Sequence, residues 1–397
     1  MPGAFTRERK LSFPRLLSLM LSGLCASVQS KLDRFFALLA GEPGYRREVS
    51  DRAFAKARRS FSARAFGQLN DWLLGRLAER IEAHHWCGLR VVAADASRLS
   101  VSTRAGAALA ADHYAFTLYL PGAELTLHAS LHLGDGSERQ MLFEALEVLQ
   151  PGRDVLVLDR GYVGNTPIAW LAQQGHFFCL RVDAYSWRCV REFLHSSETE
   201  RIVTLAAPSR ADCATYEIAP HPTTVRLIRN LAPGGQVRVL MTNLLDSRAF
   251  APEHFATLYH QRWRLEEAFK RIKHRLDLEA VSGLTYLALQ QDFAAKILAD
   301  NLCAALALAD TPPEADSRPN RTYALSALRT LIAPCLLGLA HALDALAPTL
   351  DAIDRARCRI QPDRHYPRPR RTKPHKYKAY KHGVIRACPL TDCCPCG

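Results

Sequence analysis

The chain has no apolar run long enough to cross a bilayer, and it contains no internal repeat. Its twelve cysteines follow no spaced framework over most of the chain, which favours a reducing compartment over secretion. Residues 16–27 follow a basic start and resemble a signal peptide. However, Pro14 suits a helix start, and the apolar pattern continues to Gly41. We therefore expect a helix there, a cytoplasmic protein and no membrane partner.

Acidic residues are in short supply, with 39 Asp and Glu against 52 Lys and Arg, a net charge of +13. The excess lies at the two ends of the chain. Residues 355–386 hold twelve Lys and Arg against one acid, and residues 1–90 hold sixteen against eight. Two basic ends around a less basic middle favour a polyanionic partner held by flanking arms. The alternative is a basic tail that only confers solubility or is disordered.

With 397 residues and 48% hydrophobic side chains, the chain is long enough for two or three globular domains. Apolar spacing predicts helices over 13–40, 50–60 and 62–84, with Ser50 and Ser62 as N-caps. The second of these helices is basic on its exposed face. We interpret residues 1–86 as a helical DNA-binding region, or alternatively as a plain packing domain.

The rest of the chain divides by pattern into five further segments. Strands and helices alternate first, short strands without a long helix follow, and helical patterns return before a Pro-rich basic end. The fold class predicted is α/β with a mixed sheet. The expected segments are 87–183 (first part of the catalytic core), 184–250 (β-rich insertion, including a strand at 214–218), 251–285 (core helix), 286–355 (helical region) and 356–397 (basic, largely unstructured tail).

Two aspartates stand directly after buried apolar strands. Asp95 follows LRVVAA and Asp159 follows VLVL. In an open α/β sheet, side chains at the carboxyl ends of strands point into the crevice where ligands bind. Aspartate is also a common turn residue, so each position alone has a structural interpretation.

One helical stretch, YHQRWRLEEAFKRIKHRL, carries a distinctive polar face. Tyr259, Arg262, Glu266 and Lys273 fall within about 60° of one another on a helix, and Lys270 joins them. The alternative is the solvated face of an ordinary amphipathic helix. Together with the two aspartates, however, Glu266 completes a set of oxygen ligands that could hold two hard cations for phosphodiester chemistry.

These residues resemble the Y-R-E-K signature of bacterial insertion-sequence DDE transposases of the IS-four-like branch. Asp159 lies in LDRGY, similar to the second-Asp motif of that branch, and Asp95 lies in AADASRL, similar to the first. The words MTNLLD (241–246) and RHYPR (364–368) also resemble family features, so the resemblance runs from about Val49 to Arg368.

The resemblance implies a ribonuclease-H-like core with a β-rich insertion. It implies that Asp95, Asp159 and Glu266 are catalytic and bind two Mg²⁺ ions, for which Mn²⁺ substitutes. The implied partners are double-stranded DNA, as terminal inverted repeats and target, and a second copy of the chain on that DNA. The implied route is cut-and-paste transposition through a DNA hairpin, without a nucleotide cofactor, by a cytoplasmic protein that associates with the nucleoid when bound.

Several DNA contacts follow from the same resemblance. Arg262 offers a planar fork for a phosphate, and Tyr259 can bind a phosphate and pack on a sugar or base. Lys273, Lys270 and Arg160 are cations for the DNA backbone, with surface ion pairs as the alternative. Trp187 is the one Trp in the insertion and could stack on a flipped base, or could belong to the core.

Two alternative functions remain open at this point. One is a DNA-binding relative that has lost catalysis, and the other is a ribonuclease-H-like nuclease without strand transfer. The terminal cysteines fit no standard zinc spacing, which favours an unstructured end. They are Cys388, Cys393, Cys394 and Cys396.

Overall fold

The structure is a computed structural model of the 397-residue chain. It describes residues 5, 9–23, 27–101, 112–134, 136–231, 237–283, 285–309, 311–312 and 316–359. The chain divides into two units, 1–360 and 361–397. The second unit, with the RHYPR motif and the terminal cysteines, lies outside the described residues. Within the described ranges, no helix combines the length and apolarity that crossing a membrane requires.

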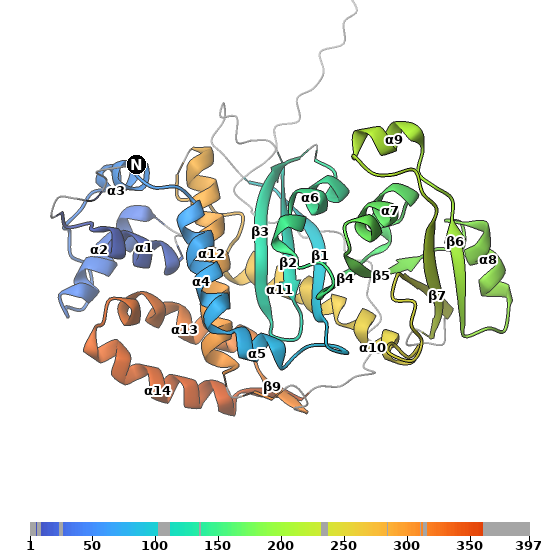
Figure 1. The fold of residues 1–397 in the computed structure, drawn as a ribbon. Coiled ribbons are helices and arrows are strands. Elements are labelled where there is room, and N and C mark those ends of the chain that lie inside the picture. The colour runs from blue at the N-terminus through green and yellow to red at the C-terminus, as the bar shows by residue number, and fades with distance from the viewer. Residues whose placement is uncertain are drawn as a thin grey trace, which may run out of the picture. The chain divides into compact units, whose positions relative to one another are not determined.

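The N-terminal region consists of short helices, shown in blue in Figure 1. The helix expected over 13–40 is two helices, because the first ends at Ser22 and Gly23 takes a positive φ of 78°. Ser50 caps its helix as predicted, with its hydroxyl accepting from Ala53 N at 3.2 Å. The helices are α1 (Phe13–Leu21), α2 (Val28–Leu39), α3 (Asp51–Arg58), α4 (Arg64–Arg76) and α5 (Ala78–Glu82).

The basic face expected on α3 is in part wrong. Arg58 is buried and reaches across to the C-terminal region, where its Nη2 donates to Asp292 at 2.8 Å and its Nε to Gln291 at 2.8 Å. A buried guanidinium requires such partners, since an unpaired charge in the core is costly. Arg58 therefore holds two helical regions together and is not available to a polyanion.

The centre of the fold is one eight-stranded mixed sheet of order β3-β2-β1-β4-β5-β8-β7-β6. Strands β1, β4 and β5 are parallel, whereas β2 is antiparallel to both β1 and β3. This is the ribonuclease-H-like arrangement that the resemblance implied. The strands are β1 (Arg90–Leu99), β2 (His113–Leu120), β3 (Leu125–Leu133), β4 (Asp154–Leu158), β5 (Phe177–Val182), β6 (Glu200–Leu205), β7 (Thr223–Leu231) and β8 (Val237–Thr242).

The strands of the 184–250 segment extend this same sheet. β8 pairs antiparallel with β5, and β7 and β6 continue outward from it (Figure 1). The strand expected at 214–218 is wrong, because Ser209 caps a short helix there by accepting from Asp212 N at 3.1 Å. The segment thus contains two helices, α8 (Arg188–His195) and α9 (Arg210–Thr215).

Helices cover both faces of the sheet. Alternation along β1 sends Val92 and Ala94 to one face and Val91 and Ala93 to the other. The first face packs against α6 (Glu138–Glu144), the 3₁₀ turn η2 (Leu146–Val148), α7 (Asn165–Gln173) and α8. The second face packs against α10 (His254–His260), α11 (Arg262–Arg275) and α12 (Tyr286–Ala307).

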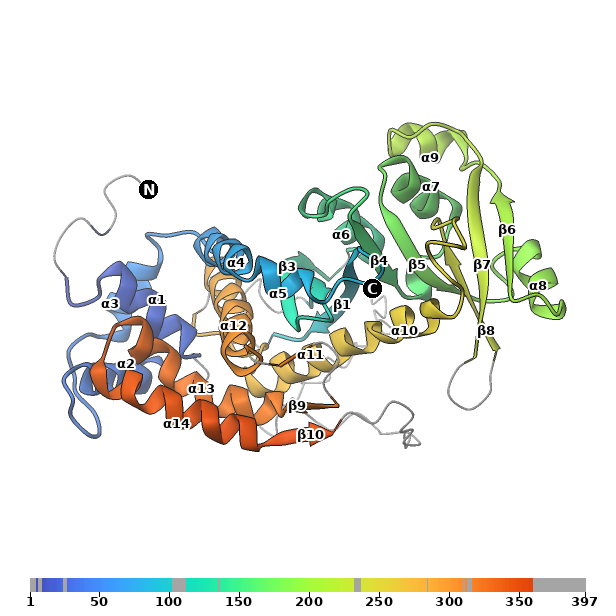
Figure 2. The ribbon, with the colours of Figure 1, turned by 60° about the horizontal axis from the view of Figure 1, so that its bottom comes forward.

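The C-terminal region is helical, as expected. α12 lies beside α4 and β3 in both ribbon views (Figures 1 and 2). It continues into α13 (Arg321–Leu336) and α14 (Ala340–Arg355), and a small sheet joins β9 (Ser317–Pro319) to β10 (Arg357–Arg359). β10 gives regular structure to the first residues of the segment expected to be unstructured.

Candidate active site

Asp95 and Asp159 lie on neighbouring parallel strands. The pairing of β1 with β4 sets Val91 opposite Val155 and Ala93 opposite Val157, and the same offset places Asp95 level with Asp159. Adjacent strands lie about 4.8 Å apart. The expectation that β1 ends at Asp95 is wrong, because β1 continues to Leu99 by pairing with β2 alone. Asp95 therefore stands just beyond the last pairing of β1 with β4, where β4 ends.

Both aspartates belong to the face that α10 and α11 cover. Side chains alternate along a strand, so Asp95 shares the side of Val91 and Ala93. Asp159 follows Leu158 and begins the 3₁₀ turn η3 (Arg160–Tyr162), where its Oδ1 accepts from Gly161 N at 2.6 Å. Figure 2 shows α10 and α11 end to end in yellow beneath β1 and β4.

The single helix predicted for the YREK residues is two helices. Gln261 separates α10 from α11, because hydrogen bonds tighten there to i→i−3, from Gln261 N to Leu258 O and from Arg264 N to Gln261 O. Tyr259 therefore lies on α10, and Arg262, Glu266 and Lys273 lie on α11. Tyr259 and Arg262 are 5% and 8% exposed. At Tyr259 and Arg262 the polar face thus points at the sheet and is not an open solvated surface.

Arg262 connects the helix to the aspartates. Its Nη2 donates to Glu266 Oε1 at 2.8 Å. Burial opposes its charge, but Tyr259, Glu266 and Asp95 together raise the pKa of the guanidinium. Its Nε is buried and has no hydrogen-bond partner among the described residues. This donor is available to an anionic group that enters the site.

The Asp95 carboxyl is electrostatically unusual. Its Oδ1 accepts from Ala96 N at 2.9 Å. Burial raises its pKa from 3.8 to about 7, and the nearby Asp159 and Glu138 contribute in the same direction against Arg262. A half-buried carboxylate beside other carboxylates is costly without a cation. The site therefore favours a proton or a metal at this position.

Sequence reasoning missed two residues of the site. Glu138 begins α6 on the opposite face of the sheet, and burial followed by Asp159 raises its pKa. Tyr162 ends η3 and is 1% exposed, and burial, Glu138, Asp95 and Asp159 raise its pKa well above the ordinary value. Tyr162 is part of the motif LDRGY, so the sequence could have pointed to it as a site residue. Nothing in the local sequence distinguishes Glu138.

The two lysines predicted for DNA differ in environment. Lys273 Nζ donates to Arg98 O at 2.5 Å and pairs with Glu279 at 3.1 Å, so it ties α11 to the far end of β1. Lys270 is exposed on α11. Lys270 can thus meet a partner directly, whereas Lys273 already has protein ligands.

Arg160 and Trp187 lie further out. The Arg160 side chain is 67% exposed and pairs with Asp183 at 3.5 Å. Trp187 is half-buried, and its indole N–H donates to Asn165 Oδ1 at 2.8 Å, at the start of α7. Arg160 lies on the segment after β4 and Trp187 on the segment after β5, at the same edge of the sheet as Asp159.

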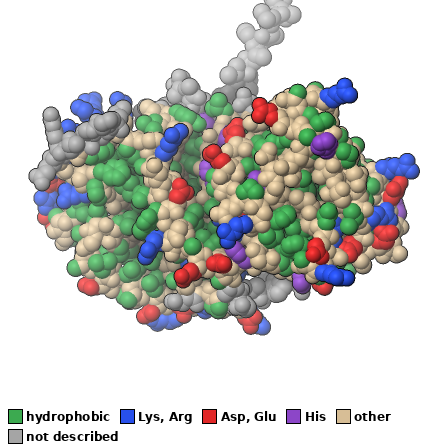
Figure 3. Space-filling model, viewed as in Figure 1, with side chains coloured by type: hydrophobic (Ala, Val, Ile, Leu, Met, Phe, Trp, Pro, Cys, Tyr) green, Lys and Arg blue, Asp and Glu red, His purple; other side chains and the backbone are tan. Residues whose placement is uncertain are grey.

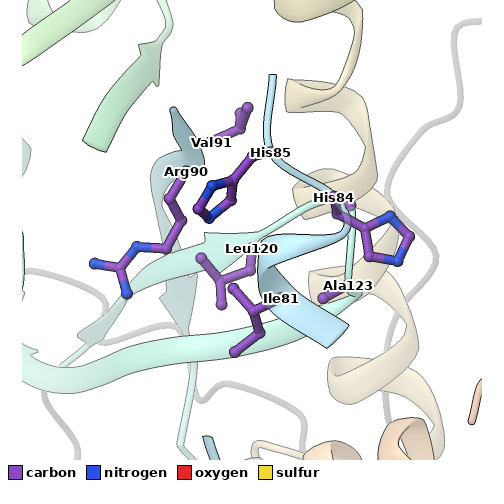
Figure 4. A pocket seen from close by; sticks show the side chains of 8 residues that line it. Ile81, His84, His85, Arg90, Val91, Leu120 and Ala123 are labelled. Carbon is purple, nitrogen blue, oxygen red and sulfur yellow. The ribbon is translucent and has the colours of Figure 1, made fainter. Parts of the chain in front are cut away.

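Two hollows of the described chain lie away from Asp95, Asp159 and Glu266. One, of about 10 Å³, lies at the start of β1 and contains His84 and His85 (Figure 4). Burial, with Arg318 next in effect, lowers the pKa of His84 to about 4, so this imidazole is neutral. On the face shown in Figure 3, Lys and Arg are interspersed with Asp and Glu and form no single patch.

The donor chemistry of the site fits hard divalent cations. Asp95, Asp159 and Glu138 act electrostatically on the Tyr162 hydroxyl, which is buried without a hydrogen-bond partner among the described residues. Oxygen-rich sets of this kind suit Mg²⁺ and Mn²⁺. In the described ranges, no group of three or more His, Cys, Asp or Glu side chains is close enough to hold a metal as it stands. Glu266, in particular, is turned toward Arg262.

Comparison with known proteins gives one family. Residues 86–302 match the family described as the transposase DDE domain, more than half of the chain. No curated protein matches the sequence. Among solved structures, the cryo-EM structure of a piggyBac transposase synaptic complex with hairpin DNA has a TM-score of 0.42 and 10% identity, over 88% of this chain and 78% of that chain.

Proposed function

The chain belongs to the transposase DDE domain family, and from that premise we propose that it cleaves and transfers DNA strands at the ends of an insertion sequence. The observation that carries the proposal is the level placement of Asp95 and Asp159 beneath the helix that bears Arg262 and Glu266. We further propose membership of the IS-four-like branch, on the YREK residues.

In this proposal three carboxylates of the chain are the metal ligands. Asp95, Asp159 and Glu266 hold two divalent cations, Mg²⁺ or Mn²⁺. When bound, the cations neutralise charge on the phosphate and favour deprotonation of the attacking oxygen. Burial of Asp95 supports this assignment, since its ionisation becomes favourable beside a cation. Glu266 must leave Arg262 to complete the set.

Arg262 then becomes free to hold DNA. A guanidinium that gives up a carboxylate can bind a phosphate through two parallel N–H···O bonds. Its unpaired Nε supports this exchange. We propose that Tyr259 orients Arg262 and the phosphate, that Lys270 and Arg160 meet the DNA backbone, that Lys273 does so near the end of β1, and that Trp187 stacks on a base at a hairpin step.

We also propose how the chain engages its DNA. Terminal inverted repeats are bound as double-stranded DNA by two copies, since each active site processes one end, and the helical region 286–355 is the proposed contact between copies. Residues 1–86 are the proposed end-binding region. The basic tail, 356–397, is the proposed flanking arm, and its residues 356–386 hold eleven Lys and Arg against one acid.

The test is cleavage of a labelled duplex that carries the element's own terminal repeat, with Mg²⁺ or Mn²⁺. Wild type is compared with Glu266→Gln and with Glu267→Gln, an exposed neighbour on the same helix. We expect wild type and Glu267→Gln to nick at the repeat boundary. We expect Glu266→Gln to bind the duplex without cutting.

Each other outcome selects a different function. If all three proteins bind and none cuts, the chain is a DNA-binding relative without catalysis. If wild type cuts but no joined or hairpin product forms, the chain is a nuclease. If Glu266→Gln cuts as well as wild type, the assignment of Glu266 is wrong.

A further inference from the structure

We propose that Glu138 is a fourth carboxylate ligand of the divalent-cation site and that it binds a cation together with Asp159. This inference rests on the proposed function, because it adds a ligand to the same site. The set Asp95, Asp159 and Glu138 is called the carboxylate cluster below. Glu138 reaches this cluster from α6, on the face of the sheet opposite to α11.

Distances measured from Gly161 give an upper limit on the separation of the Glu138 and Asp159 carboxylates. A β-carbon at this glycine would stand 2.9 Å from Asp159 Oδ1 and 3.5 Å from Glu138 Oε2. The two carboxylate oxygens are therefore no further apart than the sum of these distances. Mg²⁺ binds oxygen at about 2.0–2.1 Å, and paired catalytic ions lie about 3.5–4 Å apart. Carboxylates this near can serve one pair of ions.

A second observation points to a ligand among these carboxylates. The Tyr162 hydroxyl is fully buried and has no hydrogen-bond partner among the described residues. The charged groups that act on it most strongly are Glu138, Asp95 and Asp159, in that order. A buried hydroxyl normally has a partner, and leaving it without one costs about 1–3 kcal/mol. A cation with its bound water in the carboxylate cluster would supply that partner.

Arg139 holds Glu138 in this position. Its Nε donates to Gly161 O at 3.0 Å and its Nη2 donates to Val163 O at 2.7 Å. The neighbour of Glu138 thus clamps the start of α6 to η3, the turn that follows Asp159, and to Val163 directly after that turn. A clamp of this kind sets the spacing of Glu138 and Asp159 before any ligand arrives.

The arrangement gives the site ligands from both faces of the sheet. Glu266 approaches from α11 and Glu138 from α6, with Asp95 and Asp159 between them. Glu266 is paired with Arg262 at 2.8 Å, and the three residues of the carboxylate cluster must draw closer together before they hold a cation. We infer that Glu138 holds the first cation and that Glu266 joins when DNA takes over Arg262.

The experiment measures metal binding without DNA and without turnover. Free Mn²⁺ is followed by electron paramagnetic resonance while the full chain is titrated. Wild type is compared with Glu138→Gln, Glu266→Gln and Glu144→Gln, the last being an exposed acid at the other end of α6. We expect Glu138→Gln to weaken the tightest Mn²⁺ site about 10- to 100-fold. Glu144→Gln should bind as wild type does, and Glu266→Gln should change the tightest site less than Glu138→Gln.

The outcomes separate this inference from the proposed function. If wild type binds Mn²⁺ and Glu138→Gln binds it equally well, Glu138 is not a ligand and the inference is overturned. If wild type binds no Mn²⁺, the two-metal function itself fails. The unfolding temperature in EDTA shows that each variant is folded. Should Glu138→Gln fail to fold, Glu138→Asp keeps the charge but withdraws the oxygen, and unchanged Mn²⁺ affinity in that variant overturns the inference.

Discussion

Asp95→Asn should stabilise the metal-free protein. The folded pKa of Asp95 is raised to about 7 from 3.8, so the native state binds a proton more tightly than the unfolded chain does. Stability is then lost as pH rises through this window and is regained below it. Asn has the same shape, keeps an oxygen for Ala96 N, and carries no charge. The variant therefore removes the cost of ionising a buried carboxylate.

The pKa shift sets the size of the effect. The difference between the folded and unfolded pKa values of Asp95 lowers the free energy of unfolding of wild type by about 4 kcal/mol at about pH 8. At about pH 5 it lowers it by about 2 kcal/mol. Partial exposure of the carboxyl to water reduces both figures, so we expect a gain of about 2–4 kcal/mol at the higher pH. The gain should shrink by about half at the lower pH.

Urea unfolding in EDTA at the two pH values measures this gain. Asp71→Asn is the control, because Asp71 is an exposed acid on α4, and its substitution should change stability by less than about 0.5 kcal/mol. Added Mn²⁺ should then stabilise wild type more than Asp95→Asn. If Asp95→Asn is less stable than wild type in EDTA at the higher pH, our account of the Asp95 environment is wrong.

Three further predictions concern the site, the core and the DNA surface. Tyr162→Phe should raise metal-free stability by about 1 kcal/mol, because it removes a hydroxyl without a hydrogen-bond partner among the described residues, and a loss of stability in urea would contradict this. Asp300→Asn should cost about 3–5 kcal/mol, since Asp300 is fully buried between two arginines, whereas Glu192→Gln in an exposed ion pair should cost under about 0.5 kcal/mol in the same assay. Lys270→Gln should weaken binding to repeat and random duplexes alike and lower the slope of log K against log salt by about one, and an unchanged slope would exclude a phosphate contact.

Much of the core could be predicted from local sequence. The apolar words before Asp95 and Asp159 became β1 and β4. Short buried strands bounded by turn residues carry this information within a few positions. The mixed α/β class followed from the order of these elements.

Two errors have different causes. The residues 214–218 alternate weakly like a strand, but the local cap of Ser209 on Asp212 N begins a helix that runs to Thr215. Arg58 was expected to face a polyanion, but Asp292 and Gln291 draw it into the core. Neither partner is adjacent in sequence, so a local pattern could not reveal either contact.

The sequence by itself determined which residues are the candidates for the chemistry: two acids after apolar strands, and one acid among cations on a helix. Only the tertiary structure decided that Glu138 and Tyr162 join Asp95 and Asp159, and that Arg262 holds Glu266. The physical reason is that strand alternation and helix periodicity fix which face a side chain takes, whereas the pairing of β1 with β4 and the packing of α6 and α11 fix which faces meet.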